Sequence, residues 1–458
     1  FTWHGCRYAE VRGISAEQAT KALLTFIPVH SSVGQICRFR CDNETINKLV
    51  EITLRSDKSN FIFYPYDCPH REKNGWTADA AISAEQMLYT FDAYESLRQW
   101  LFCIRKAQRK DGALPGIIPT AGWGFTFGNG PAWDSVLIEL PYQLYRFYGK
   151  SEIVTENAAA IEKYFKYIGT KSNADGLIEI GLGDWCQTYT HAEGDYETPV
   201  EVTDSLTMIS LAEKTAEMFE KVGLNAENIQ RFGEILRKNF RKKYIVSEKL
   251  TVQTQTALAM CLHLNIFTEK EGKEAYAQLL ESIRRQGNHF RVGVIGYRYL
   301  FETLAKHGDQ NLCFHLIAQN SFPSYGYILG QGATTLWESF EEYERKDGEL
   351  QRKDGVKLIM SFNHHFWGGV LAWIYRYIGW LNVKSADTVE IVPMIFNCVN
   401  RAEISYSRNG KDIFVKWEKV SENIKLSVKN NGFNCMFKHN GQEKILDGDC
   451  ELVIDLKK

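Results

Sequence analysis

The sequence has no long apolar run and no marked excess of either charge. Its longest apolar stretch, residues 366–375, is followed directly by Arg376, whereas a helix needs about 20 apolar residues to cross a bilayer. The formal net charge is −2, and lysine and arginine are scattered along the chain. No basic surface is therefore expected to bind nucleic acid or an anionic membrane. We expect neither as a partner, and the oligomeric state stays open.

Several chemical signatures are also missing. The eleven cysteines form no spaced framework and no Cys-x-x-Cys pair, a scatter typical of free thiols in a reducing compartment. This favours the cytoplasm. The chain begins at Phe1 rather than at methionine, so we expect a leader or an upstream domain before it, and a periplasmic or secreted location stays an alternative. No Gly-x-Ser-x-Gly elbow and no phosphate-binding glycine loop is present, and no cofactor is predicted.

Strand-like alternation marks the two ends of the chain. Segments 7–12 and 35–40 alternate with period two, so we interpret residues 1–40 as the tail of an upstream β domain or a linker. Residues 385–458 alternate again, with Asn-Gly turn signals between the runs. We predict a small C-terminal β-sandwich there.

Between these ends, residues 41–384 follow the 3.6-residue period of helices. About a dozen helices with almost no strand between them predict consecutive antiparallel pairs that close as an (α/α)6 barrel. The fold class is thus mainly α, with a β-strand remnant before the barrel and a sandwich after it. We expect helices near residues 43–57, 79–108, 132–148, 152–170, 204–222, 226–241, 253–264, 268–285, 293–307, 309–319 and 364–380.

A dense polar run at residues 67–79 is the first candidate for chemistry. It contains Asp67, Arg71, Glu72 and Asp79, and an aromatic segment precedes it. A solvated loop with a helix cap is the plain alternative. The arginine between two carboxylates favours acids that are held in place.

The second candidate acid is Glu338, which follows a glycine-rich loop and Trp337. A lone acid of this kind is common on protein surfaces, but together with Glu72 it indicates a pair of catalytic acids. Glycoside hydrolysis needs one carboxylic acid to protonate the leaving oxygen and one carboxylate opposite it, which activates water or attacks directly. The high aromatic content, 13% of residues, suits either a large helical core or a site where rings stack on a sugar.

Adjacent histidines, His364 and His365, invite a metal hypothesis. No further histidine or cysteine stands at ligand spacing, so we predict no metal. A histidine that binds a sugar hydroxyl suits these surroundings better.

Taken together, these motifs resemble the family 78 glycoside hydrolases, the α-L-rhamnosidases. The resemblance covers nearly the whole chain, and its landmarks occur in the family's order. It departs from the commonest pattern where Arg71 directly precedes Glu72 and where Lys73 and Ala78 stand. The matching segments are Phe1-Thr2-Trp3-His4-Gly5-Cys6-Arg7-Tyr8, Asp67-Cys68-Pro69 with Arg71-Glu72, Trp76 and Asp79, Gly183-Asp184-Trp185, Thr334-Thr335-Leu336-Trp337-Glu338, and Asn363-His364.

The resemblance implies an inverting exo-glycosidase that removes terminal α-L-rhamnosyl residues from a carbohydrate substrate. Glu72 would be the general acid and Glu338 the general base. The other implied residues bind the sugar, the polar ones through its hydroxyls and the tryptophans as an apolar wall: Asp67, Arg71, Asp79, His364, Trp76, Trp133 and Trp185.

Two other functions remain from the residues alone. One is a different (α/α)6 exo-acting carbohydrase, such as a glucosidase or glucuronyl hydrolase, which only a substrate panel separates from the first. The other is a catalytically inactive sugar-binding protein, against which the presence of both Glu72 and Glu338 argues.

Overall fold

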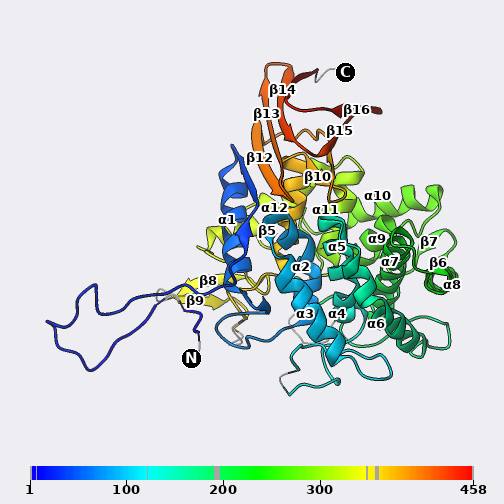
Figure 1. Ribbon diagram of the computed structural model, residues 1–458, viewed down its shortest axis with the longest axis horizontal. Coiled ribbons are helices and arrows are strands. Elements are labelled where there is room, and N and C mark those ends of the chain that lie inside the picture. The colour runs from blue at the N-terminus through cyan, green and yellow to red at the C-terminus, as the bar shows by residue number, and fades with distance from the viewer. Residues whose placement is uncertain are drawn as a thin grey trace.

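The computed structural model describes residues 3–6, 8–120, 122–189, 196–346, 349–355 and 360–455. Helices fill its centre, and strands gather at the C-terminal end (Figure 1). The helices are α1 (Glu44–Ser59), α2 (Thr77–Thr90), α3 (Tyr94–Ala107), α4 (Pro131–Asp134), α5 (Val136–Tyr148), α6 (Glu152–Gly169), α7 (Val200–Lys221), α8 (Glu227–Tyr244), α9 (Gln255–His263), α10 (Glu269–Arg285), α11 (Gly296–Lys306), α12 (Gln310–Ala318), α13 (Tyr325–Gly330), the 3-10 helix η1 (Phe366–Gly369), α14 (Val370–Trp373) and the π-helix η2 (Ile374–Ile378).

An inner ring of helices closes on itself. Contacts run from α2 to α5, then to α7, α9, α11 and α14, and from α14 back to α2. The outer helices α3, α6, α8, α10 and α12 pack against this ring. Consecutive helices thus alternate between the two layers, and the expected (α/α)6 barrel is confirmed.

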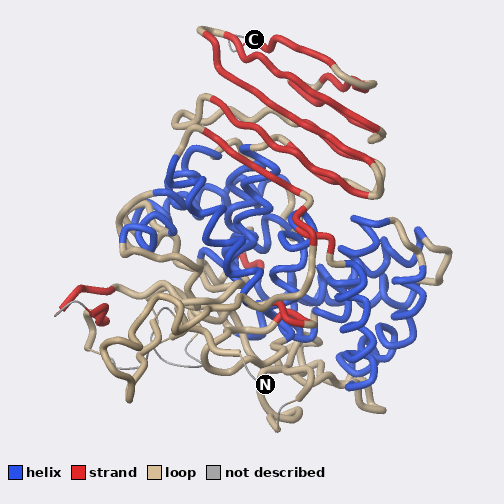
Figure 2. Tube along the Cα trace, turned by 60° about the vertical axis from the view of Figure 1, so that its left-hand side comes forward, coloured by secondary structure: helices blue, strands red, loops and turns tan. Residues whose placement is uncertain are grey.

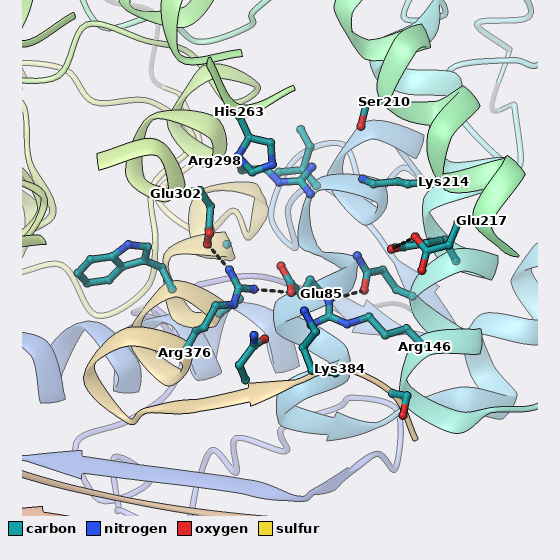
Figure 3. A pocket seen from close by; sticks show the side chains of 18 of the residues that line it. Glu85, Arg146, Ser210, Lys214, Glu217, His263, Arg298, Glu302, Arg376 and Lys384 are labelled. Atoms are coloured by element: carbon teal, nitrogen blue, oxygen red, sulfur yellow. Dashed lines mark hydrogen bonds and ion pairs between the residues drawn. The ribbon is translucent and has the colours of Figure 1, made fainter. Parts of the chain in front are cut away.

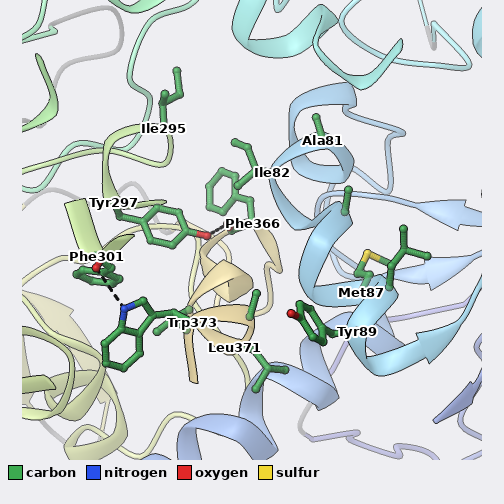
Figure 4. Packing of buried hydrophobic residues seen from close by; sticks show 14 of the residues in the cluster. Ala81, Ile82, Met87, Tyr89, Ile295, Tyr297, Phe301, Phe366, Leu371 and Trp373 are labelled. Carbon is green, nitrogen blue, oxygen red and sulfur yellow. Dashed lines mark hydrogen bonds between the residues drawn. The ribbon is translucent and has the colours of Figure 1, made fainter. Parts of the chain in front are cut away.

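Burial distinguishes the inner layer from the outer one. Every residue of α2 from Thr77 to Ala84 is buried, whereas the outer helix α8 buries a single stripe that includes Ile229, Leu236 and Phe240. A stripe at helical spacing covers a core on one side only, while an all-round apolar helix needs neighbours on every side. The core inside the ring brings together Ile82 of α2, Tyr297 of α11, Phe366 and Trp373 (Figure 4).

One predicted helix forms two separate helices in the structure. The expected helix over 79–108 breaks at Phe91–Asp92, which forms a short strand, β5, between α2 and α3. Phe91 pairs with Gln35 of β1. The chain passes here from the inner to the outer layer, so it must reverse direction, and local helical periodicity carries no sign of that reversal.

The strand expectation for residues 7–12 is wrong for its described part. Residues 8–12 form no strand, and their side chains are exposed. A strand needs a partner for its backbone groups, and alternation alone does not supply one. The strand expected at 35–40 does form, as β2 (Cys37–Cys41), and it pairs with Arg401–Arg408 of the C-terminal region.

Two sheets make up the C-terminal region, which Figure 2 shows on one side of the helices, with loops gathered on the opposite side. One sheet has the order β17-β14-β13-β12-β2 and the other β10-β11-β15-β16. The strands are β1 (Gly34–Gln35), β2 (Cys37–Cys41), β3 (Phe61–Ile62), β4 (Tyr64–Pro65), β5 (Phe91–Asp92), β6 (Ile245–Val246), β7 (Lys249–Leu250), β8 (Tyr343–Lys346), β9 (Glu349–Arg352), β10 (Leu381–Val383), β11 (Thr388–Ile391), β12 (Arg401–Arg408), β13 (Lys411–Val420), β14 (Asn423–Asn431), β15 (Asn434–His439), β16 (Gln442–Leu446) and β17 (Cys450–Asp455).

A tryptophan pair joins this region to the barrel. The rings of Trp380 and Trp417 stack with centroids 4.5 Å apart and an interplanar angle of 7°. The Trp417 indole N–H donates to the Ile378 carbonyl, 2.8 Å away, at the end of η2. The described part of the chain contains no helix that is both long and apolar enough for a bilayer.

Replacing Trp417 by alanine should lower the free energy of unfolding by about 3–5 kcal/mol, because a fully buried ring, its stack and its hydrogen bond are lost together. Val453→Ala is the control in the same sheet: Val453 is 70% exposed, so its loss should stay within about 0.5 kcal/mol. Urea unfolding measures both variants. Equal losses would contradict the assigned role of the Trp380–Trp417 pair.

Candidate active site

The loop between β4 and α2 holds Glu72 at the N-terminal end of the inner ring. Asp67 Oδ1 accepts the Asn74 backbone N–H at 2.7 Å, which ties the start of the loop to its end. Gly75 lies so close to the Ile118 carbonyl that a Cβ there would clash with it. Glycine therefore lets the loop reach the barrel, and α2 begins two residues later.

Arg71 bridges the two candidate catalytic glutamates. Its Nη2 lies 3.1 Å from Glu72 Oε1 and 3.2 Å from Glu338 Oε2. The second oxygen of Glu72 accepts the Trp76 indole N–H at 2.7 Å. Two acids that stand 266 positions apart in the chain thus share one guanidinium. The Arg71 side chain lies between them.

Two loop segments fix Glu338. Its backbone N–H donates to the Ser361 carbonyl at 2.8 Å, and the Ser361 N–H donates back to Glu338 Oε2 at 2.7 Å. The Glu338 carbonyl accepts the Trp367 indole N–H at 2.9 Å. The Glu338 side chain is 8% exposed, whereas the Glu72 side chain is 28% exposed. One acid is therefore buried and rigidly held, and the other lies nearer to solvent.

His364 pairs with Asp79 at the same end of the ring. Its Nε2 lies 2.7 Å from Asp79 Oδ1, and its Nδ1 lies 3.9 Å from Glu338 Oε2. Burial lowers the pKa of His364, but the charges of Asp79 and Glu338 outweigh burial and raise this pKa to about 9. Burial raises the pKa of Asp79, and the histidine opposes that rise. We infer an imidazolium that joins α2 to the segment before η1.

Asp67 is the third buried carboxyl here. Burial raises its pKa to about 7, while the nearby His364 charge lowers it. The Cys68 thiol donates to Asp67 Oδ2 at 2.8 Å. Near neutral pH this carboxyl is divided between its two protonation states, so it can either donate or accept a hydrogen bond.

The other histidine of the pair is structural. His365 Nδ1 contacts Ser83 Oγ at 2.9 Å, and burial lowers its pKa to about 3. Its ring is therefore neutral and bound to α2. Among the described residues, no group of three or more histidine, cysteine or acidic side chains is arranged to hold a metal ion.

Aromatic rings flank the carboxylates. Trp76 contacts Trp123 and Phe127, with ring centroids 6.0 and 6.1 Å away. Trp133 and Trp185 meet edge to face at 6.5 Å. Cys186, next to Trp185, places this second pair near the acids: burial raises the pKa of its thiol, and the charges of Glu338 and Asp79 raise it further.

Three further contacts support the site, and no role was predicted from the sequence for the residues that make them. Ser361 acts through its backbone. Asp184 is fully buried and accepts bonds from Thr256 Oγ1 and three backbone N–H groups at the start of α11, at 2.6–3.0 Å, so it fixes the loop that carries Trp185. The Trp3 backbone carbonyl accepts a hydrogen bond from Lys73 Nζ at 2.7 Å. The Gly183-Asp184-Trp185 motif marked the second, while backbone groups leave no signal in a sequence.

The inner and outer rings of helices, with acids at one end of the ring, define the chain as a six-hairpin glycosidase fold. Residues 34–378 match the family described as bacterial alpha-L-rhamnosidase 6 hairpin glycosidase domain. The chain belongs to this family.

Known relatives agree with this assignment. An alpha-L-rhamnosidase from Streptomyces avermitilis is 28% identical over 434 residues, which are 93% of this chain and 40% of that protein. One from Alteromonas sp. (strain LOR) is 28% identical over 444 residues, 93% of this chain and 47% of the relative. The chain thus spans less than half the length of these relatives.

Solved structures share the fold. The Streptomyces avermitilis alpha-L-rhamnosidase complexed with L-rhamnose superposes with a TM-score of 0.82 at 25% identity, covering 93% of this chain and 42% of that one. The native enzyme from Aspergillus terreus gives 0.86 at 24% identity, covering 93% and 51%.

The imidazole of His364 should stay protonated well above neutral pH. Its NMR titration midpoint should lie near 9 rather than at the ordinary 6.5, because two carboxylates face it. Since the folded pKa is the raised one, the stability it contributes is complete below about pH 6.5 and is lost as pH rises through about 9. Asp79→Asn should move the midpoint down. A wild-type midpoint at or below 6.5 would refute the ion pair.

Proposed function

We propose that this chain is the catalytic part of an inverting exo-glycosidase that hydrolyses terminal α-L-rhamnosyl residues of glycosides or oligosaccharides. The observation that carries the proposal is the convergence of Glu72 and Glu338 on Arg71, beside the Asp79–His364 pair. Membership of the alpha-L-rhamnosidase family is the reason for proposing rhamnose as the sugar.

The different exposure of Glu72 and Glu338 to solvent supports different catalytic roles for the two glutamates. The general acid must reach the oxygen of a leaving group that departs into solvent, which suits the partly exposed Glu72. The base must hold one water in a fixed direction, which suits the buried Glu338 with its bonds from Ser361 and Arg71. Glu72 is therefore the proposed acid and Glu338 the proposed base.

The remaining polar residues suit sugar hydroxyls. Within the described residues, His364 Nδ1 is buried and has no hydrogen-bond partner, so it can donate to a hydroxyl. Asp67 and Asp79 offer acceptors close to it. Trp76, Trp133 and Trp185 supply apolar faces for the ring and methyl group of rhamnose. Each of these roles belongs to the proposal.

Arg71 gives the site a further property. Its guanidinium contacts the near oxygens of both glutamates, which brings these two oxygens closer than the ~6.5–9.5 Å between carboxyl groups typical of inverting enzymes. A sugar and a water placed between the acids must take over part of this contact. We propose that Arg71 turns to a sugar hydroxyl when substrate binds.

The sugar specificity is tested with a panel of nitrophenyl glycosides. The α-L-rhamnoside should be cleaved far faster than the glucosides, galactosides or glucuronides, because the site pairs hydroxyl-binding groups with an apolar wall. Equal or faster turnover of another sugar would overturn the assignment and favour a different exo-acting carbohydrase.

The two glutamates should respond differently to the leaving group. A general acid matters most when the departing oxygen is a poor leaving group. Glu72→Gln should nearly abolish cleavage of a rhamnose-containing disaccharide and spare more of the activity on an aryl rhamnoside, whereas Glu338→Gln should damage both about equally. Each loss should be on the order of 10²–10⁴-fold in kcat/KM.

Glu51→Gln is the matched control for these variants, because Glu51 is an exposed acid on α1 and its loss should leave both rates unchanged. The reversed pattern, with Glu338→Gln as the leaving-group-sensitive variant, would exchange the roles. An intact disaccharide rate in either variant would show that the substituted glutamate does not have the proposed catalytic role.

A further inference from the structure

A second cavity lies away from the proposed active site, beside the C-terminal halves of α2, α5 and α7 and along α11. Its volume is about 760 Å³. Side chains from the C-terminal halves of α2, α5 and α7, from α11 and from η2 line it, as do residues that follow β10. Asp79 lies in the first turn of α2, while Glu85 of the same helix faces this cavity. The cavity is therefore separate from the proposed active site.

The carboxylates of this cavity are already paired. Glu85 binds both Arg146, at 2.7 Å, and Arg376, and Arg376 also binds Glu302. Figure 3 shows Glu302, Arg376, Glu85 and Arg146 as a connected row across the cavity. Lys214 is paired with Glu139 at 2.5 Å. Each of these three carboxylates thus already binds at least one cation.

Two cations that line the cavity lack such a partner. Within the described residues, the side chains of Arg298 and Lys306, both in α11, form neither an ion pair nor a hydrogen bond. The Arg298 side chain is partly buried and stands beside His263 (Figure 3). A guanidinium has five N–H donors, and no acceptor of the described chain takes up those of Arg298.

Helix dipoles account for one of these cations but not for the other. Lys306 ends α11, where the helix carries partial negative charge. Arg298 lies in the first turn of the same helix, where the dipole disfavours a cation. Burial lowers the pKa of Arg298, but the charges of Glu139 and Glu85 outweigh burial and raise this pKa. The guanidinium therefore stays charged, although within the described residues it forms no ion pair with either carboxylate.

The pKa of the neighbouring His263 reflects the positive charges around the cavity. Burial lowers the pKa of His263, and the charges of Lys306, Lys214, Arg376 and Arg298 lower it further, to about 3. Its Nδ1 is buried without a hydrogen-bond partner in the described part of the chain. A neutral histidine ring and a guanidinium thus stand side by side on the wall of the cavity.

We propose that this cavity binds a small organic oxyanion, with Arg298 as its principal ligand, His263 beside Arg298, and Lys306 as a further cation on the cavity wall. The anionic group would accept the forked N–H donors of Arg298 in the manner of a carboxylate or phosphate. The cavity is several times larger than one such group, so the rest of the ligand is a polar body of roughly sugar size. The site is independent of the glycosidase proposal.

Isothermal titration at constant ionic strength tests the site with inorganic phosphate, citrate, glucuronate and glucose 6-phosphate, and with glucose as the neutral control. At least one anion should bind while glucose does not, and whether the sugar acid or the sugar phosphate binds more tightly distinguishes the two anionic groups. Arg298→Gln should weaken binding about tenfold or more. Lys306→Gln, at an exposed position that tolerates substitution, should weaken it by a smaller factor.

Arg231→Gln is the matched control, because Arg231 is an exposed cation on α8 outside the cavity. This variant should bind the anion as the wild type does. Failure of every anion to bind, or equal binding by Arg298→Gln and Arg231→Gln, would overturn the proposal.

Discussion

The buried pair of Asp79 and His364 is the contact on which the site depends. It joins α2, the first helix of the inner ring, to the segment that leads into η1 and α14, the last. Glu72 stands just before α2, and Glu338 is bonded to Ser361 just before His364. Closure of the ring of inner helices therefore also brings Glu72 and Glu338 together. A glycosidase site built in this way exists only in the folded barrel.

Periodicity predicted most of this fold because inner and outer helices both carry strong local patterns. The failures arose where a partner distant in sequence decides the outcome. Phe91 breaks a helical run because the chain turns between layers and pairs with Gln35. Residues 8–12 alternate without finding a strand to pair with. Sequence cannot display such partners, so those elements required the structure.

The groups of the site also differ in whether the sequence could predict them. Asp67, Arg71, Glu72, Glu338 and His364 stand in recognisable motifs, and the structure brings them into one network. The groups that hold them are largely backbone N–H donors, such as that of Ser361 and those that bind Asp184, and any residue type supplies these. The cations of the second cavity, around Arg298, come from several helices spread over the barrel, so no local sequence motif indicates them.

The central claim is that Glu338 activates water rather than attacking the sugar, with Arg71 positioned between base and acid. Proton NMR of the first-formed rhamnose, recorded during cleavage of an aryl α-L-rhamnoside and before mutarotation, tests it most directly. An inverting site predicts that the β anomer appears first, because water enters from the face opposite the leaving group. Appearance of the α anomer first would show retention and would contradict the account.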